Sequence, residues 1–214
     1  MPGTLVAVCA VHKLHDGHSR AGPTAIDKRP LAVAVRIEPS GVLGDRQIEE
    51  SHGGRNQALY AYAREEAARW ADEVGFEIPP GSFGENLATS GLPVTDAVVG
   101  ERWRIGRTVV VETTMPRTPC ATFQSWMGQP QWVKRFTQRG DVGSYLRVLI
   151  PGTVRAGDRI EVIARPAHGV TIREVFNAAE QDPRRLRRLL DEADDLAPKT
   201  AVQVRRALAA AGAP

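Results

Sequence analysis

Short apolar runs separated by turn-forming residues follow one another along the first three-quarters of the chain. Residues 4–11 are apolar and rich in β-branched side chains, which predicts a buried strand. Residues 12–23 are polar and predict a loop, and residues 31–37 predict a second strand bounded by prolines. Four shorter runs predict further strands at residues 101–105, 108–113, 145–150 and 159–164. Strands of this length and spacing are typical of a small barrel or sandwich.

A period of 3.6 residues predicts helices between and after these strands. Residues 56–74 place apolar side chains such as Leu59 and Trp70 on one stripe and charged side chains on the other, and Gly75 follows as the predicted C′ residue. Residues 120–128 and 132–139 predict two short helices inserted between strands. The predicted fold class is therefore α+β.

The last fifth of the chain has no strand pattern. Thr171 with Glu174 forms a predicted capping box, and Pro183 and Pro198 occupy predicted first positions of helices. Three short helices are predicted, at about 171–179, 183–192 and 198–211. We therefore expect a β domain over residues 1–166 and a three-helix extension over residues 167–214.

Composition narrows the class of protein. The chain has 214 residues, of which 42% are hydrophobic and 25% charged, so disorder is a poor interpretation. The net charge of +3 is too small to indicate a nucleic-acid partner. No apolar run is long enough to span a membrane. With two cysteines and no visible signal peptide, the expected location is the reducing cytoplasm.

The segment that ends at Cys120 is the most informative for chemistry. Pro116 and Pro119 stiffen the chain before a predicted helix, and Arg117 lies three residues before the thiol. A helix N-terminus and a nearby guanidinium both favour a thiolate, which attacks electrophiles and binds soft metals. The alternative is an inert buried thiol. Cys9 lies inside an apolar strand and is predicted to be core.

Two glycine-containing segments are candidates for ligand binding. The first segment, made of His52, Gly53, Gly54 and Arg55, precedes the predicted helix, so its backbone N–H groups and the arginine would suit an anion. The alternative is an ordinary glycine turn, with Asn56 as the N-cap of the helix. The adjacent Glu85 and Asn86 follow a turn-rich loop. The Asn86 amide would recognise an amide edge such as a pterin ring, or would cap its own loop.

Histidines and one acidic turn offer weaker signals. His12, His15 and His18 recur at every third position, but no cysteine or carboxylate completes a metal site, so solvent-exposed side chains are the preferred interpretation. Asp45 after Gly44 is interpreted first as a turn residue. A protease-like pairing of Cys120 with His52 stays open on the sequence.

Taken together, these segments resemble the MOSC domain, named for the C-terminal domain of molybdenum cofactor sulfurase. The resemblance rests on the order and spacing of six blocks, Lys28-Arg29-Pro30, Gly44-Asp45-Arg46, His52-Gly53-Gly54, Phe83-Gly84-Glu85-Asn86-Leu87, Val99-Gly100-Glu101 and Pro116-Arg117-Thr118-Pro119-Cys120. The tail from His168 resembles the three-helix extension of a bacterial branch linked to hydroxylaminopurine resistance. The resemblance implies a small irregular β-barrel with inserted helices.

The resemblance also implies a chemistry. Cys120 would be the protein thiolate ligand to molybdenum in a pterin-based cofactor, and the substrate would be an N-hydroxylated small molecule such as an N-hydroxylated purine. Reducing equivalents would come from a separate flavin or Fe–S protein. The candidate catalytic residues are Cys120, Glu85 and His52. The candidate cofactor-binding residues are Lys28, Gly53, Gly54, Arg55, Asn86 and Arg117.

One position of the sequence departs from the pattern of the MOSC family. Two other functions also remain open. Ser51 stands where close members often carry a second histidine, so no role is given to a histidine pair. A sulfur carrier or transferase would use the same Cys120 environment to hold a persulfide. A non-catalytic protein would bind the cofactor and dock a partner through its C-terminal helices. The sequence leaves the oligomeric state undetermined.

Overall fold

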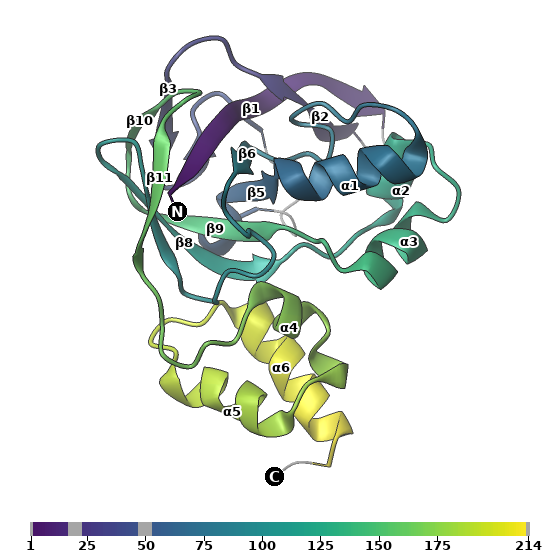
Figure 1. Cartoon of the computed structure of the whole chain (residues 1–214), viewed down its shortest axis with the longest axis vertical. Helices are drawn as coiled ribbons and strands as arrows, with labels where there is room; N and C mark the ends of the chain where they lie inside the picture. Colours follow the sequence, from purple (N-terminus) through teal and green to yellow (C-terminus); the bar gives the residue numbers. More distant parts are fainter. Residues whose placement is uncertain (1, 17–22, 47–52, 213–214) are drawn as a thin grey trace.

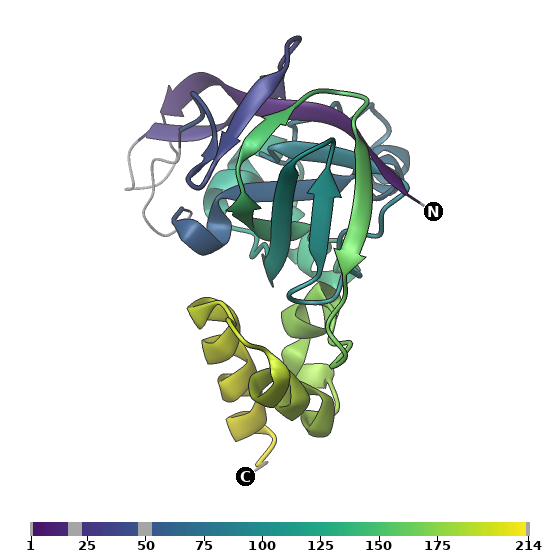
Figure 2. The same cartoon turned by 90° about the vertical axis from the view of Figure 1, so that its left-hand side faces the viewer.

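Seven strands close into a barrel in the computed structural model, which describes residues 2–16, 23–46 and 53–212. In ring order they are β1 (Gly3–Asp16), β11 (Arg159–Ala164), β7 (Arg102–Ile105), β8 (Val109–Pro116), β9 (Ser144–Ile150), β5 (Leu59–Ala63) and β6 (Leu87–Ser90). The ring closes because β1 pairs with β6 on one side and with β11 on the other. Figures 1 and 2 show the barrel above a separate group of helices. The α+β class and the barrel are thus confirmed.

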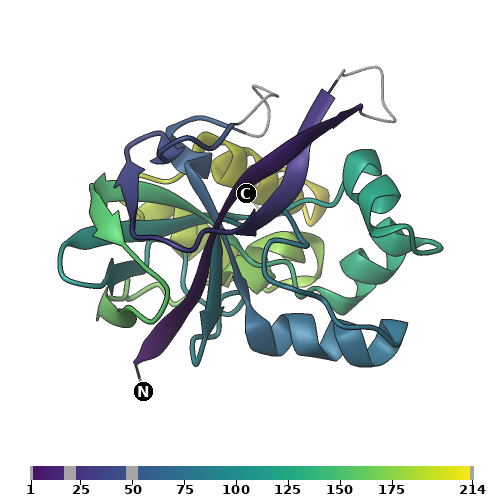
Figure 3. The ribbon, with the colours of Figure 1, turned by 90° about the horizontal axis from the view of Figure 1, so that it is seen from above.

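The long strand β1 also builds a hairpin outside the ring. Its second half pairs with β2 (Pro23–Pro30), which crosses the top of the barrel in Figure 3. A small sheet of β10 (Gly152–Val154), β3 (Val35–Glu38) and β4 (Gly41–Val42) lies beside it. The predicted loop at 12–23 is therefore wrong over residues 12–16, which belong to β1, while residues 17–22 lie outside the described residues. The strand predicted at 31–37 begins only at Val35. Backbone pairing carries both strands through polar residues that sequence patterning assigns to loops.

The predicted helix at 56–74 is wrong in its first half. The structure has a 3₁₀ turn, η2 (Arg55–Gln57), then strand β5, and only then helix α1 (Arg64–Val74). All five side chains of β5 are buried, and a short run that is apolar on both faces fits a buried strand as well as a helix. Gly75 has the predicted role, since its φ of 78° ends α1 in the left-handed conformation.

Three helices cover one side of the barrel, as Figure 3 shows. They are α1, α2 (Ala121–Met127) and α3 (Trp132–Arg139), and the last two confirm the predicted inserted helices. An aromatic cluster beneath them contains Trp70, Phe83, Phe123, Trp132 and Phe136. This cluster holds two segments in place, the loop at residues 83–86 and the start of α2.

The C-terminal extension contains α4 (Ile172–Phe176), η3 (Ala178–Glu180), α5 (Pro183–Glu192) and α6 (Pro198–Ala210). The capping box at Thr171 is present, and Asp182 caps α5 by accepting a hydrogen bond from the Arg184 N–H. The extension contacts the barrel, since the Thr200 hydroxyl donates to the carbonyl of Thr114 at 2.8 Å. Apolar side chains of α4, α5 and α6 also belong to the same buried cluster as the aromatic side chains above.

The two cysteines differ in burial. Cys9 is fully buried, which confirms its core assignment, and burial raises the pKa of its thiol. Cys120 is a half-buried free thiol.

Within the described ranges, every helix is too short or too polar to cross a bilayer.

Candidate functional site

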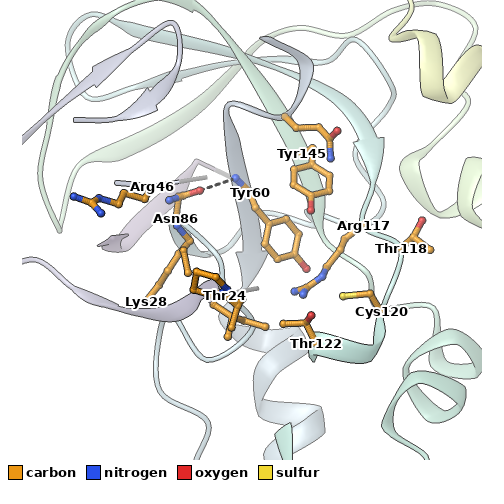
Figure 4. Close-up of a pocket in the computed structure, with 15 residues that line it drawn as sticks. Thr24, Lys28, Arg46, Tyr60, Asn86, Arg117, Thr118, Cys120, Thr122 and Tyr145 are labelled. Carbon is orange, nitrogen blue, oxygen red and sulfur yellow. Dashed lines mark hydrogen bonds between the residues drawn. The ribbon is translucent and has the colours of Figure 1, made fainter. Parts of the chain in front are cut away.

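A pocket of about 120 Å³ lies between β2, β9 and the start of α2. Its lining residues are Pro23, Thr24, Ala25, Ile26, Lys28, Arg46, Gln57, Tyr60, Gly84, Asn86, Arg117, Thr118, Cys120, Thr122 and Tyr145. Figure 4 shows the Cys120 sulfur, the Arg117 guanidinium and the Tyr145 hydroxyl pointing toward a common space. Three of the predicted site residues besides Cys120 also line this pocket: Lys28, Asn86 and Arg117.

Cys120 occupies the position that the sequence predicts. Strand β8 ends at Pro116, a short extended segment follows, and Cys120 is the N-cap of α2 with φ −134°. Its carbonyl accepts the first helical hydrogen bond, from the Gln124 N–H at 2.9 Å. The thiol is half-buried and lines the pocket, so it is accessible to a small ligand.

Arg117 places a positive charge inside the protein next to this thiol. Its guanidinium carbon lies 3.9 Å from the Phe123 ring centroid and 5.2 Å from that of Tyr60, and Nη1 donates to the carbonyl of Phe83. Burial disfavours the charge, but Tyr60 and neighbouring groups raise the pKa of Arg117 above its usual value. The guanidinium is therefore charged, and it is held by ring stacking and one carbonyl.

Lys28 and Asn86 meet at Asp45. The Asp45 carboxylate accepts from the Lys28 ammonium, from Asn86 Nδ2 at 2.7 Å and from the Val11 N–H at 2.8 Å. Asn86 Nδ2 also donates to the carbonyl of Cys9 at 3.2 Å, so both amide hydrogens are used. Its Oδ1 accepts from the Tyr60 N–H at 3.2 Å. Asn86 thus joins β1, β5 and the Asp45 turn, which leaves no amide hydrogen for recognising a pterin edge.

Glu85 lies behind the pocket wall. Only 1% of it is exposed, and its carboxylate accepts from the N–H groups of Gly81 at 2.6 Å and Phe83 at 3.0 Å. Burial raises the pKa of this carboxyl group, although the backbone donors oppose that shift. The structure does not bring Glu85 into the pocket. Its role here is to hold the loop that presents the Phe83 carbonyl to Arg117.

The helix start on which the predicted anion site depends is wrong, because a 3₁₀ turn and a strand follow Gly54. Gly53, Gly54 and Arg55 are not among the lining residues of the pocket. Arg55 is exposed and pairs with Asp195 at 3.3 Å. His52 lies outside the described residues, so its proposed catalytic role and its pairing with Cys120 stay predictions.

Sequence reasoning missed several residues of the wall. Arg46, Gln57, Tyr60 and Tyr145 line the pocket together with three threonines. Tyr60 and Tyr145 are directly opposite each other on β5 and β9, with ring centroids 5.2 Å apart. In the sequence they read only as apolar positions, because their strand pairing is not a local signal. Arg46 was visible within the Gly44-Asp45-Arg46 block but had no assigned role.

The donor set of the pocket limits what it can bind. The described residues contain no group of three or more His, Cys, Asp or Glu side chains that would hold a metal ion. The part of the wall made by described residues offers one sulfur, the cations of Lys28, Arg46 and Arg117, and no carboxylate. Such a wall suits an anionic complex that brings most of its own ligands and accepts one soft ligand from the protein.

Comparison with known sequences finds one matching family model and two similar proteins. The profile of the MOSC domain family matches residues 49–161, more than half of the chain. Protein YiiM of Escherichia coli is 31% identical over 166 residues, which cover 75% of this chain and 73% of that protein. A protein named "Reductase" from Gibberella moniliformis is 30% identical over 172 residues, 77% of this chain. The chain spans only 30% of that reductase.

Solved structures share the whole architecture. YiiM of Geobacillus stearothermophilus superposes with a TM-score of 0.78 at 22% identity, covering 97% of this chain and 100% of that one. A hypothetical protein gives 0.77 at 26% identity, with coverage of 99% and 91%. YiiM of Escherichia coli gives 0.73 at 24% identity, with coverage of 98% and 94%. Because nearly all of the chain is covered, the C-terminal helices are part of this similarity.

Proposed function

This chain belongs to the MOSC domain family, and from that premise we propose that it is an oxidoreductase that binds molybdenum cofactor through Cys120 and reduces N-hydroxylated small molecules. One observation carries the proposal. A half-buried thiol and a buried guanidinium face the same pocket, to which the described residues contribute no carboxylate. The similarity to a protein named "Reductase" supports an oxidoreductase. The similarity to YiiM supports membership in the bacterial branch described above, and the link of that branch to hydroxylaminopurine resistance suggests the substrate class.

The residues of the pocket fit such a cofactor. A pterin-bound molybdenum carries sulfur and oxygen ligands of its own, so it needs one protein thiolate rather than a cluster of ligands. Cys120 is that ligand. The phosphate of the cofactor needs cations at the wall, which Lys28 and Arg46 supply in place of the predicted Arg55. Asp45 offsets part of the Lys28 charge, so Arg46 is the less compensated of the two.

When bound, the cofactor supplies a metal centre that takes an oxygen atom from the substrate. The protein residues prepare the pocket for this chemistry. Arg117 keeps a fixed positive charge at the pocket wall, which attracts the anionic groups of the cofactor. Thr24, Thr118 and Thr122 offer hydroxyl groups that both donate to and accept from a polar N–OH group.

Metal analysis of protein made in a cofactor-competent host tests the proposal. Wild-type protein should contain molybdenum, Cys120→Ala should lose most of it, and Cys9→Ala serves as the matched thiol control. The loaded wild-type protein with a chemical reductant should convert an N-hydroxylated purine to the amine. Equal molybdenum in wild type and Cys120→Ala would remove Cys120 as the ligand. A mass increase of one sulfur on Cys120, without molybdenum, would favour the persulfide carrier instead.

A further inference from the structure

A second cavity, of about 320 Å³, lies between the barrel and the C-terminal extension, and we name it the interface cavity. Its lining comes from the start of β7, from β8 and β9, and from residues 164–168 and 192–197, which precede α4 and connect α5 to α6. Figure 1 shows this end of β8 facing the C-terminal helices. The described residues that line it include none that line the Cys120 pocket, so the two spaces are separate.

His168 brings a buried hydrogen-bond donor to this cavity. It lines the cavity and is only 2% exposed, and its Nδ1 accepts from the Val170 N–H at 3.0 Å. Burial lowers the pKa of His168 below its usual value, although Glu192 and the Val99 carbonyl oppose the shift, so the ring is neutral at pH 7. A neutral ring that accepts at Nδ1 carries its hydrogen on Nε2. Among the described residues, no group forms a hydrogen bond with this Nε2.

Arg147 brings a second donor. It lies on β9 with 4% of its surface exposed, and it lines the same cavity. Its Nη atoms pair with Glu112 and with Asp195, the second at 2.6 Å, but its Nε has no hydrogen-bond partner in the part of the chain that the structure describes. A buried N–H group without an acceptor costs free energy, which an acceptor on a ligand would recover. Two such donors at one cavity therefore indicate a ligand with acceptor atoms.

The charges of the lining limit the class of this ligand. Three arginines line the cavity, and each is paired with a carboxylate: Arg102 with Glu112, Arg147 with Asp195 and Arg165 with Glu101. Glu192 and Asp194 add two exposed carboxylates to the lining. An anion would lie close to these acidic groups, whereas a cation would leave the donors of His168 and Arg147 without acceptors. A neutral molecule that combines acceptor atoms with an N–H donor satisfies both conditions.

We propose that the interface cavity binds a neutral nucleobase-type heterocycle. Its ring nitrogens or carbonyl oxygen accept hydrogen bonds from His168 Nε2 and Arg147 Nε, and its N–H group donates to a carboxylate of the lining. The volume lies in the range of small-molecule sites, and Val99, Pro166 and Leu196 provide apolar contacts for the ring faces. Because the lining comes from both the barrel and the extension, the ligand stabilises the contact between them. This site is separate from the proposed function at Cys120.

Histidine NMR with adenine as the probe tests the donor directly. The chain has five histidines, so comparison with His168→Asn assigns the His168 signal in protein that contains nitrogen-15-labelled histidine. Without adenine, the spectrum should show a hydrogen on Nε2 of His168. Adenine should shift the signals of this nitrogen and of its hydrogen. A hydrogen on Nδ1, or a signal that adenine leaves in place, would overturn the proposal.

Calorimetry with blocking variants locates the site. Ala167→Trp fills the interface cavity and should abolish adenine binding, while Ala209→Trp, at an exposed position of α6 outside the lining, should retain it. Thr122→Trp, which blocks the Cys120 pocket, should also retain it. Loss of binding in Thr122→Trp but not in Ala167→Trp would place adenine beside Cys120 and rule out the second site.

Affinity and thermal unfolding measure the contribution of the donor. His168→Asn keeps an acceptor for the Val170 N–H but lacks the donor at Nε2, so it should weaken adenine binding about tenfold. Adenosine monophosphate, the same base with a negative phosphate, should bind at least about tenfold more weakly than adenine. At ten times its Kd, adenine should raise the Tm of the wild-type protein by about 3–6 °C.

Equal affinity of wild type and His168→Asn would refute the role of His168. No binding heat and no change in Tm with adenine would mean that the cavity holds water only, which would also refute the proposal. These measurements use the protein without cofactor, so their outcome is independent of the molybdenum content and turnover that test the proposed function.

Discussion

Glu66 is a buried carboxyl group whose charge the fold opposes. It lies on α1 with 4% of its surface exposed. Its Oε1 accepts from the Thr95 N–H at a long 3.3 Å, and its Oε2 has no hydrogen-bond partner among the described residues. Burial raises the pKa of Glu66 to about 7, and the negative charge of Asp141 adds to the shift against the opposing hydrogen bonds of Thr95. The group therefore titrates near neutrality in the folded protein.

The size and sign of the effect follow from this pKa. The difference between an ordinary 4.5 and about 7, at about 1.4 kcal/mol for each pKa unit, corresponds to about 3 kcal/mol. The folded protein holds the Glu66 proton more tightly than the unfolded chain does. The resulting stabilisation is complete below pH 4.5, and it is lost as the pH rises to about 7. Above that pH the charged carboxylate lowers the free energy of unfolding by about 3 kcal/mol.

Glu66→Gln removes the charge and keeps the shape. In urea unfolding at about pH 8, the variant should exceed wild type in free energy of unfolding by up to about 3 kcal/mol. At about pH 5 the gain should fall below about 1 kcal/mol, because folded wild-type protein is protonated there. Asp72→Asn, an exposed site on the same helix, should change stability by less than about 0.5 kcal/mol at both pH values. A pH-independent difference between Glu66→Gln and wild type would refute the raised pKa.

Two further variants test the walls of the site. Gly81→Ala should lower the free energy of unfolding in urea by more than about 2 kcal/mol, because the φ of Gly81 is 92° and an added Cβ would lie 2.2 Å from a carbonyl oxygen of β2. Gly157→Ala is the control, since its φ is 91° but the space around it is open, and it should cost about 1 kcal/mol. Equal costs for the two variants would contradict the close contact at Gly81. Asn86→Leu should cost about 2–4 kcal/mol in the same assay because it leaves buried donors and acceptors on β1 and β5 unpaired, and a neutral result would show that Asn86 is not a cross-link.

Local signals were sufficient for the helices that carry their own caps. The capping box at Thr171, the aspartate before Pro183 and the glycine after α1 act within a few residues, so they predict the helix ends wherever the rest of the chain lies. The predicted helix over residues 56–74 failed in its first half for the opposite reason. Strand β5 is buried on both faces by its neighbours β6 and β9, and no local pattern records those neighbours.

The candidate site divides in the same way. The proline-stiffened segment before Cys120 and the buried arginine within it are sequence-local, and the sequence predicted both as parts of one pocket. The positions of Gly54 and Arg55 depended on a helix that does not form there, and the structure leaves both outside the lining. Glu85 and Asn86 were found as candidates, but their hydrogen bonds are used to hold the wall together.

The sequence by itself determined the α+β class, the inserted and C-terminal helices, and a thiol at a helix start beside an arginine, because each depends on residues that are neighbours in the chain. Only the tertiary structure decided which strands close the barrel and which side chains face Cys120. Tyr145 reaches the pocket through the pairing of β9 with β5, and α6 docks on β8 through the hydrogen bond between Thr200 and Thr114. Contacts between residues far apart in sequence depend on the packing of the whole chain, which no local pattern specifies.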